Sequence, residues 1–315
     1  MKTLIYSIGL VCMFSCSIKS KQDAPASRQA SEALAVLRSN METQPAWLKV
    51  HAAEFLLWSG HPEGVKAIFL NENRLYSDSV PYRIGIWRVL AQAETEPQQK
   101  EAWINKIKKV FSENETDRLH AIETLAKLRV PAWGKEVELS DILSDDPVDN
   151  FAVYKLWNFA STSDENSSIA RDSLLKLSIS TDQSPAVRII SAYALKKIKS
   201  LEEASWTLLA ESALSELVDT SVQTSLLNAA ILTANEETEQ TNLYKQIKKM
   251  LISLQDKEDT NNIRMSLLDA LAEKGNTGDL DRVFSIFDKI ESTEDAASAD
   301  VLLLCAYAIL RILER

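Results

Sequence analysis

Apolar residues recur along this chain at a spacing that is typical of stacked helical units. Eight segments align on one apolar position, and successive members of the series lie roughly 34–40 residues apart, as subtraction of their numbers gives. A period of this length is the signature of repeats built from two helices, in which each unit buries its apolar face against the next. The aligned positions are Leu56, Leu90, Leu125, Phe159, Leu195, Ile231, Leu271 and Leu310.

The stretch PAWLKVHAAEFLLWSG, residues 45–60, is the clearest single unit. It reads as one amphipathic helix, which a proline opens and a glycine closes. Only 7 glycines and 8 prolines occur in 315 residues, and alternating β-branched runs are nearly absent. The prediction is an all-α fold. The expected partner helices, after a first helix over 28–40, are 63–69, 97–111, 135–143 (the weakest), 168–179, 201–217, 239–254 and 279–290.

A basic residue precedes five of the eight aligned positions by seven residues, two turns back on the same helix face. These residues are Lys49, Arg83, Arg118, Arg188 and Arg264. The aliphatic stem of such a side chain can lie along the core while its charged end reaches an acidic loop residue. We expect Asp182 to pair with Arg188 and Asp259 to pair with Arg264.

The segments DQSPAVRIISAYALKKIK (182–199) and DTNNIRMSLLDALAEKG (259–275) resemble the second helix of a HEAT repeat, with an acid, a Val-Arg or Ile-Arg pair, then Ala and Leu. The similarity covers roughly residue 44 to the end, and the second segment lacks the proline. It implies an α-α superhelix (HEAT/armadillo-like solenoid) of about eight helical pairs over residues 28–315. Such proteins usually bind other macromolecules on the concave inner surface.

The N-terminus, MKTLIYSIGLVCMFSC, has a basic start and an apolar run too short to span a bilayer. The small residue before Cys16 resembles a bacterial lipobox, although Met13 and Phe14 depart from the usual pattern. Residues 1–16 are therefore expected to be a signal peptide, with Cys16 as the lipidation site, and 17–27 a flexible tether. A plain cleaved signal peptide is the alternative. Either way, the protein is expected to be exported, as a periplasmic or cell-surface protein.

The net charge of −10 and the absence of a dense Lys/Arg run argue against nucleic acid as a partner. No Gly-rich phosphate loop, nucleophile elbow, Cys/His pair or paired metal motif is present in the sequence. We therefore expect no enzyme activity, no cofactor and no metal.

The face opposite the core is expected to line the concave surface, and it carries the candidate binding residues. These lie two and five residues before the aligned positions and are His51, Glu54, Gly85, Arg88, His120 and Glu123. Two His-x-x-Glu motifs are tempting as metal ligands, but two repeats separate them by about 16–20 Å. The alternatives are a ligand site or an acid–base–acid ladder of ion pairs.

Three further features leave alternatives open. Gly85 either forms a shallow depression or allows close packing against a neighbour. Tyr154, Trp157 and Tyr193 either form an exposed aromatic strip or lie buried under a later repeat. The last helix, residues 301–310, is apolar nearly all round and must be covered by the preceding helix or by another protein.

The function predicted from these features is a scaffold that holds a protein partner at a bacterial membrane surface. The alternative is a receptor for a small ligand or glycan, which would use the concave face.

Overall fold

The computed structural model describes residues 25–113, 115–134, 139–140, 148–162, 167–199, 201–216, 219–291 and 298–315. These ranges hold sixteen α-helices, one short 3₁₀-helix and no strand. The predicted all-α class is confirmed. None of the helices in these ranges has both the length and the apolar character needed to cross a bilayer.

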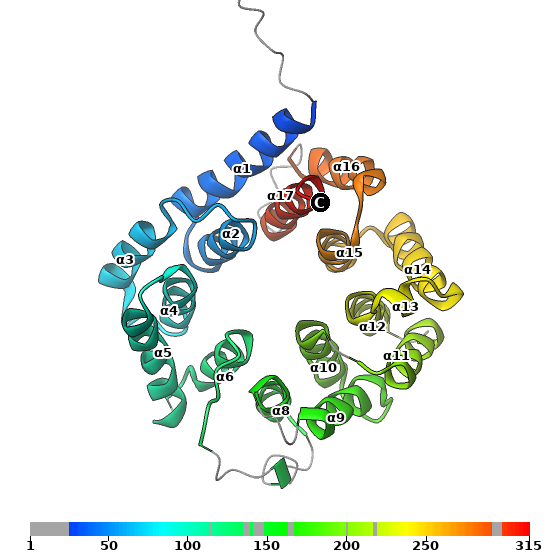
Figure 1. Ribbon diagram of the computed structural model, residues 1–315, viewed down its shortest axis with the longest axis horizontal. Helices are drawn as coiled ribbons and strands as arrows, with labels where there is room; N and C mark the ends of the chain where they lie inside the picture. The colour runs from blue at the N-terminus through cyan, green and yellow to red at the C-terminus, as the bar shows by residue number, and fades with distance from the viewer. Residues whose placement is uncertain are drawn as a thin grey trace, which may run out of the picture.

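The helices form an inner and an outer layer around a common axis (Figure 1). Most inner helices alternate along the chain with outer ones, and each packs against at least one of its sequence neighbours. The inner helices are α2 (Ala46–Trp58), α4 (Tyr82–Ala93), α6 (Arg118–Lys127), α8 (Asn150–Thr162), α10 (Pro185–Ile198), α12 (Thr220–Thr233), α15 (Asn261–Lys274) and α17 (Ala299–Leu313). The outer helices are α1 (Pro25–Thr43), α3 (Val65–Tyr76), α5 (Pro97–Ser112), α9 (Ser167–Ile179), α11 (Glu203–Ser215), α14 (Asn242–Glu258) and α16 (Leu280–Glu291).

The inner layer closes on itself. Each inner helix contacts the next from α2 to α17, and α17 then packs against both α2 and α1. The first and last helices of the chain are therefore neighbours, and the inner helices form a ring (Figure 1). The open concave surface that we expected is replaced by the inner wall of that ring.

Interactions across the seam between the two ends of the chain are both aromatic and ionic. Phe55 of α2 stacks on Tyr307 of α17, with ring centroids 4.7 Å apart. His51 Nδ1 lies 2.7 Å from Asp300 Oδ1. The aromatic stack brings apolar area to the seam, and the polar contact fixes its register.

The aligned apolar positions of the repeat lie in the core between the two layers. All eight are buried, and Phe159 is the most exposed of them at 7%. Three basic residues of the same face reach acids of other segments: Lys49 contacts Glu72 at 2.8 Å, Arg83 makes two hydrogen bonds to Asp117, and Arg188 bonds to Glu216. These ion pairs link neighbouring helices of the two layers.

Several details predicted from the sequence need correction. Arg264 pairs with Asp259 as predicted, but Arg188 bonds to Glu216 at 2.6 Å instead of Asp182. The first helix begins at Pro25, inside the segment expected to be a tether. The predicted helix over 239–254 is instead a short α13 (Glu236–Glu239) followed by α14, and that over 279–290 follows a 3₁₀ turn (Thr277–Asp279). The weak helix predicted over 135–143 lies mostly outside the described residues.

The apolar last helix is covered by the chain itself. Helix α17 packs against α1, α2, α15 and α16, and ten of its fifteen residues are buried. The preceding helix supplies part of this cover, as predicted, but ring closure supplies the rest. Helix α17 is apolar nearly all round because four helices surround it and leave little of its surface to solvent.

Candidate functional site: the central cavity

A cavity of about 700 Å³ occupies the centre of the ring. All eight inner helices contribute side chains to it, so it belongs to the closed ring and to no single repeat. Its wall mixes aromatic rings with charged and amide side chains, so it offers a ligand both apolar contact and hydrogen-bonding groups.

The wall follows the helix face that was predicted from the sequence, and one further row. The row two residues before the aligned positions contributes Glu54, Arg88, Trp157, Tyr193 and Asp269. The row two residues after them was missed. One turn further along the same face, it contributes Trp58, Gln92, Lys127, Ser161, Lys197 and Glu273. Helical periodicity alone could have found these residues.

Glu54 and Arg88 form a buried ion pair in this wall. Arg88 donates two hydrogen bonds to Glu54, at 2.7 and 2.8 Å, and the two residues are only 4% and 2% exposed. Burial raises the pKa of Glu54, but the Arg88 guanidinium outweighs burial and holds that pKa at about 2. Gln92 adds a third hydrogen bond to the carboxylate. The pair is satisfied within the protein, so it is a structural link between α2 and α4.

The predicted acid–base–acid ladder therefore forms only in part. Glu123 does not hydrogen-bond to Arg88; it pairs with Lys127 at 2.8 Å, one turn along α6. Burial raises the pKa of Glu123, but the positive charges of Lys127 and Arg88 outweigh burial. The pKa of Glu123 therefore lies below its ordinary value.

The Trp47 side chain lies between three of the predicted binding residues, His51, Gly85 and His120. Its ring lies 6.5 Å from His51 and 5.8 Å from His120, centroid to centroid. A Cβ on Gly85 would lie 2.9 Å from the Trp47 ring and 3.0 Å from Val50. The shallow depression predicted at Gly85 is thus occupied, and the alternative of close packing holds.

The aromatic strip is buried at its centre. Trp157 is 1% exposed, and its ring meets Tyr193 edge to face at 5.5 Å and Tyr154 at 6.3 Å. Tyr154 and Tyr193 are half-buried. Of the two predicted alternatives, exposure and burial, burial is the outcome. Trp157 forms part of the cavity wall, and Tyr193 is the member of the strip with charged neighbours.

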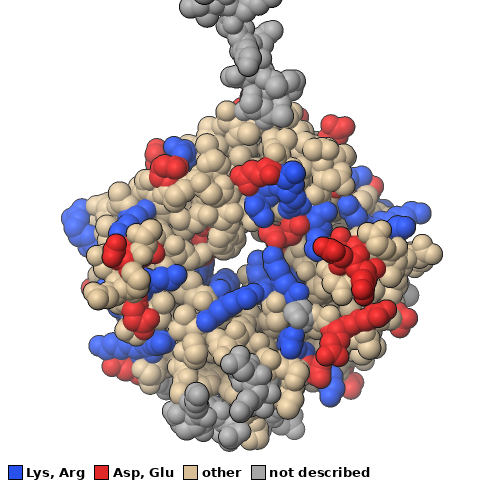
Figure 2. All heavy atoms as spheres, in the orientation of Figure 1, with Lys and Arg blue, Asp and Glu red and all other residues tan. Residues whose placement is uncertain are grey.

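Cationic side chains gather around the central hollow on one face of the molecule (Figure 2). Three of them surround Tyr193, with the ammonium groups of Lys196, Lys197 and Lys127 at 4.7, 5.6 and 5.7 Å from its ring centroid. Burial raises the pKa of Tyr193, but these three ammonium groups outweigh burial and hold it below the ordinary value. The three ammonium groups therefore make the electrostatic potential at Tyr193 more positive.

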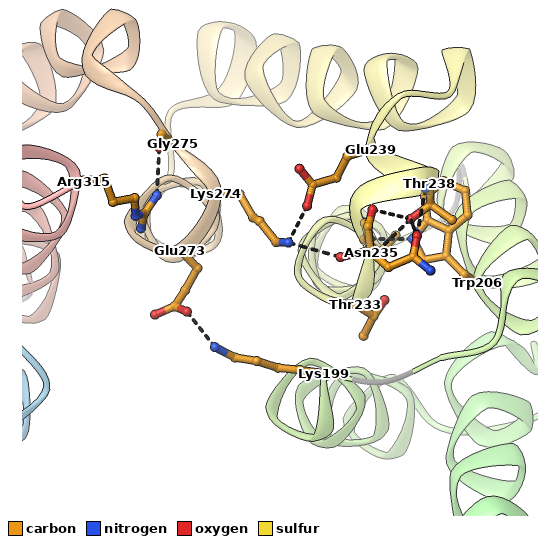
Figure 3. Close-up of polar contacts among 12 residues, drawn as sticks. Lys199, Trp206, Thr233, Asn235, Thr238, Glu239, Glu273, Lys274, Gly275 and Arg315 are labelled. Carbon is orange, nitrogen blue, oxygen red and sulfur yellow. Dashed lines mark hydrogen bonds and ion pairs between the residues drawn. The ribbon is translucent and has the colours of Figure 1, made fainter.

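Two ion pairs join α10 to α15 across the cavity. Lys196 contacts Asp269, and Lys199 contacts Glu273, both at 2.6 Å. Lys199 and Glu273 point toward each other beside α12 (Figure 3). This is possible because α12 lies between α10 and α15 and presents to the cavity the short side chains of Ser225 and Asn228.

The titration of Tyr193 is a direct test of this electrostatic arrangement. We expect Tyr193 to contribute to the earliest tyrosinate absorbance, because its pKa is held below the ordinary value, whereas burial and carboxylates raise the pKa of Tyr82, Tyr154 and Tyr307, and that of Tyr244 to about 12. Tyr193→Phe should therefore reduce the absorbance at the low-pH end of the titration, and Tyr244→Phe should leave it unchanged. An absorbance there that is the same in Tyr193→Phe and in the unmodified protein would contradict the arrangement.

No group of three or more His, Cys, Asp or Glu side chains within the described ranges is placed to hold a metal ion. Cys16, the predicted lipidation site, lies outside those ranges. No family model matches the chain, and neither a curated protein nor a solved structure is significantly similar to it.

Proposed function

We propose that this protein is an exported receptor that binds a small ligand in the cavity at the centre of a HEAT-like ring of helical pairs. The observation that carries the proposal is the cavity itself, about 700 Å³ in volume and walled by all eight inner helices. This volume lies within the range of sites for small molecules and cofactors, roughly 300–1,000 Å³. The HEAT-like assignment is supported by the burial of every aligned position. It is also supported by Arg188 and Arg264, which stand seven residues before an aligned position and pair with acids.

The receptor is proposed to act at a bacterial membrane surface, anchored by lipid on Cys16. The signal-like N-terminus supports this location. A short N-terminal segment would join the ring to the lipid anchor, so the cavity would lie in the same compartment as the anchor. Export and lipidation enter this proposal from the sequence alone.

The proposed function can be tested without knowing the ligand. A panel of neutral and acidic sugars, amino acids and small carboxylates should contain at least one class that raises the melting temperature of the protein, because binding to the native state stabilises it. Ser161→Trp, which fills the cavity from α8, should abolish that shift. Ser112→Trp, on the outer end of α5, is the matched control and should preserve it.

Two results of this panel would count against the receptor. One is a shift that is equal in Ser161→Trp and in the unmodified protein. The other is the absence of any shift across the panel, together with a native mass spectrum of the protein from its own source that shows no bound small molecule.

The protein scaffold remains the second candidate, and one observation favours it. Helix α3 and the turn after it expose Leu70, Leu75, Tyr76 and Val80, each 43–52% accessible. Because the ring encloses its inner wall, a folded partner would have to use an outer surface of this kind. A stoichiometric partner that is recovered by the unmodified protein but lost in Leu75→Glu would support the scaffold.

A further inference from the structure

The cavity is electropositive in a protein that is acidic as a whole. Seven cationic side chains and four carboxylates line it, and Glu123 and Glu314 pair with two of these cations from beside it, which leaves an excess of one positive charge, whereas the whole chain carries a net charge of −10. A concave site of one sign concentrates ligands of the opposite sign. The charge of the wall therefore indicates an anionic ligand, and this step rests on the proposed function.

Most of the charged groups in the wall are already paired. Arg88 is held by Glu54, Lys127 by Glu123, Lys196 by Asp269, Lys199 by Glu273 and Arg311 by Glu314. Within the described part of the chain, two lining cations have no carboxylate at ion-pair distance. These are Lys197 on α10 and Arg129, which follows α6.

Lys197 is held over two aromatic rings. Its ammonium lies 5.7 Å from the Trp58 ring centroid and 5.6 Å from that of Tyr193. Burial alone would lower the pKa of Lys197, but Tyr193 and the carboxylates of Asp269 and Glu273 raise it above the ordinary value. The side chain is half-buried and charged, and its donors are free for a ligand.

The neighbourhood of Lys197 makes an anion favourable there. Three ammonium groups surround Tyr193, and carboxylates neutralise only two of them. A carboxylate or phosphate at Lys197 would complete the third pair inside a partly enclosed site, where charge-assisted hydrogen bonds are roughly twice as strong as neutral ones. Arg129 is exposed at the same wall and can approach the ligand from α6.

The rest of the wall fits a polyhydroxylated ring. Trp58 is 43% exposed, and its indole nitrogen donates to Gln92 at 2.8 Å, which fixes the orientation of the ring. Such an exposed aromatic face suits the apolar face of a sugar. The uncharged polar groups of Ser161, Ser225 and Asn262 line the same cavity and can bond to hydroxyl groups.

We infer that the cavity binds an anionic sugar, whose carboxylate or phosphate is held by Lys197 and whose ring lies against Trp58. The charged group specifies the ligand, because a neutral sugar leaves the Lys197 ammonium without a partner. Uronates and sugar phosphates share this chemistry, so the test includes both.

Calorimetric titration with glucuronate, glucose 6-phosphate and glucose tests the inference. At least one of the two anionic sugars should bind roughly tenfold or more tightly than glucose, because it gains a charge-assisted hydrogen bond. Comparison of the two shows whether the site prefers carboxylate or phosphate. The bound anion should also raise the pKa of Tyr193, which gives a spectroscopic readout in the same protein.

Lys197→Met should abolish the preference for the anionic sugar, and Lys197→Arg should keep most of it. Lys100→Met, on the outer helix α5, is the matched control: it removes the same charge from an exposed position away from the cavity, so the preference should change less than about threefold. Circular dichroism and melting of each variant show that it is folded.

The outcomes separate this inference from the proposed function. If glucose binds as tightly as both anionic sugars, or if Lys197→Met binds them unchanged, the inference is wrong and the receptor stands. If no sugar binds but the wider panel gives a melting-temperature shift that Ser161→Trp removes, the inference is wrong and the receptor again stands. If no sugar binds, the wider panel gives no shift and the native mass spectrum shows no bound small molecule, both are wrong.

Discussion

Replacement of Arg88 by methionine is expected to lower the free energy of unfolding by about 3–5 kcal/mol at neutral pH, because it leaves the Glu54 carboxylate buried without its partner. Chemical denaturation of the variant measures the loss. Arg28→Met breaks the exposed Arg28–Glu32 pair on α1 and should change stability by less than about 0.5 kcal/mol. A loss in Arg88→Met as small as in Arg28→Met would contradict the buried pair.

The pH dependence of the Arg88 variant has a definite sign. In the unmodified protein the pKa of Glu54 is about 2, below its ordinary value of 4.5, so its contribution is present above pH 4.5 and is lost as the pH falls toward 2. Without Arg88, burial dominates and raises the pKa of Glu54. The variant then loses stability as the pH rises above 4.5, so the difference between the two proteins should be largest at neutral pH and should shrink as the pH falls through 4.5 toward 2.

A double replacement separates the charge from the packing. Glu54→Leu combined with Arg88→Met removes both buried charges and should recover much of the stability lost in Arg88→Met alone. No recovery would mean that the stability of this region depends on packing around Trp47 and not on the ion pair.

Tyr307→Ala is the second change with a large expected effect, a loss of about 3 kcal/mol or more in the free energy of unfolding. Tyr307 is 5% exposed, stacks on Phe55 and meets Trp58 edge to face at 6.2 Å. Truncation of an aromatic side chain in such a place leaves a cavity at the seam of the ring. Tyr307→Phe keeps the ring and removes only a 3.3 Å hydrogen bond to Glu273, so it should lose about 1 kcal/mol or less.

A double-mutant cycle links this loss to ring closure. Phe55→Ala and Tyr307→Ala should couple by about 0.5–1.5 kcal/mol, as aromatic pairs in contact do. Additive effects of the two changes would mean that α2 and α17 are not in contact in solution.

The helical layers could be predicted from the sequence because the repeat determines them locally. A period of roughly 34–40 residues and a buried apolar position in each unit identify every inner helix, from Leu56 to Leu310. Closure into a ring could not be predicted in this way. It depends on a rotation of about 45° from each of eight inner helices to the next, and small differences in side-chain packing set that angle.

The candidate site was predicted in part for the same reason. Periodicity placed Glu54, Arg88 and Tyr193 on the inner wall, and the next turn of the same helices adds Trp58 and Lys197. The roles of these residues depend on partners distant in sequence. Arg88 meets an acid 34 positions away, and Lys196 meets one 73 positions away across the cavity. Spacing along one helix does not contain that information.

The same limit explains why the alternatives at Gly85 stayed open and why the partner of Arg188 was predicted wrongly. Gly85 is packed against Trp47, which belongs to the preceding inner helix, so the apparent depression is filled by a neighbour. Arg188 pairs with Glu216, which comes after the next outer helix, although Asp182 is closer in sequence. In both cases the packing between units decides the contact, and the local motif does not.

Small-angle X-ray scattering of residues 25–315 tests the closed ring most directly. A closed arrangement of this length is expected to have a radius of gyration of about 20 Å, close to that of a compact domain of the same size. An open superhelix of eight helical pairs, stacked about 10 Å apart, would be about 80 Å long and would have a radius of gyration of about 25 Å. The smaller radius is the predicted result, and the larger one would contradict both the ring and the central cavity on which the proposed function depends.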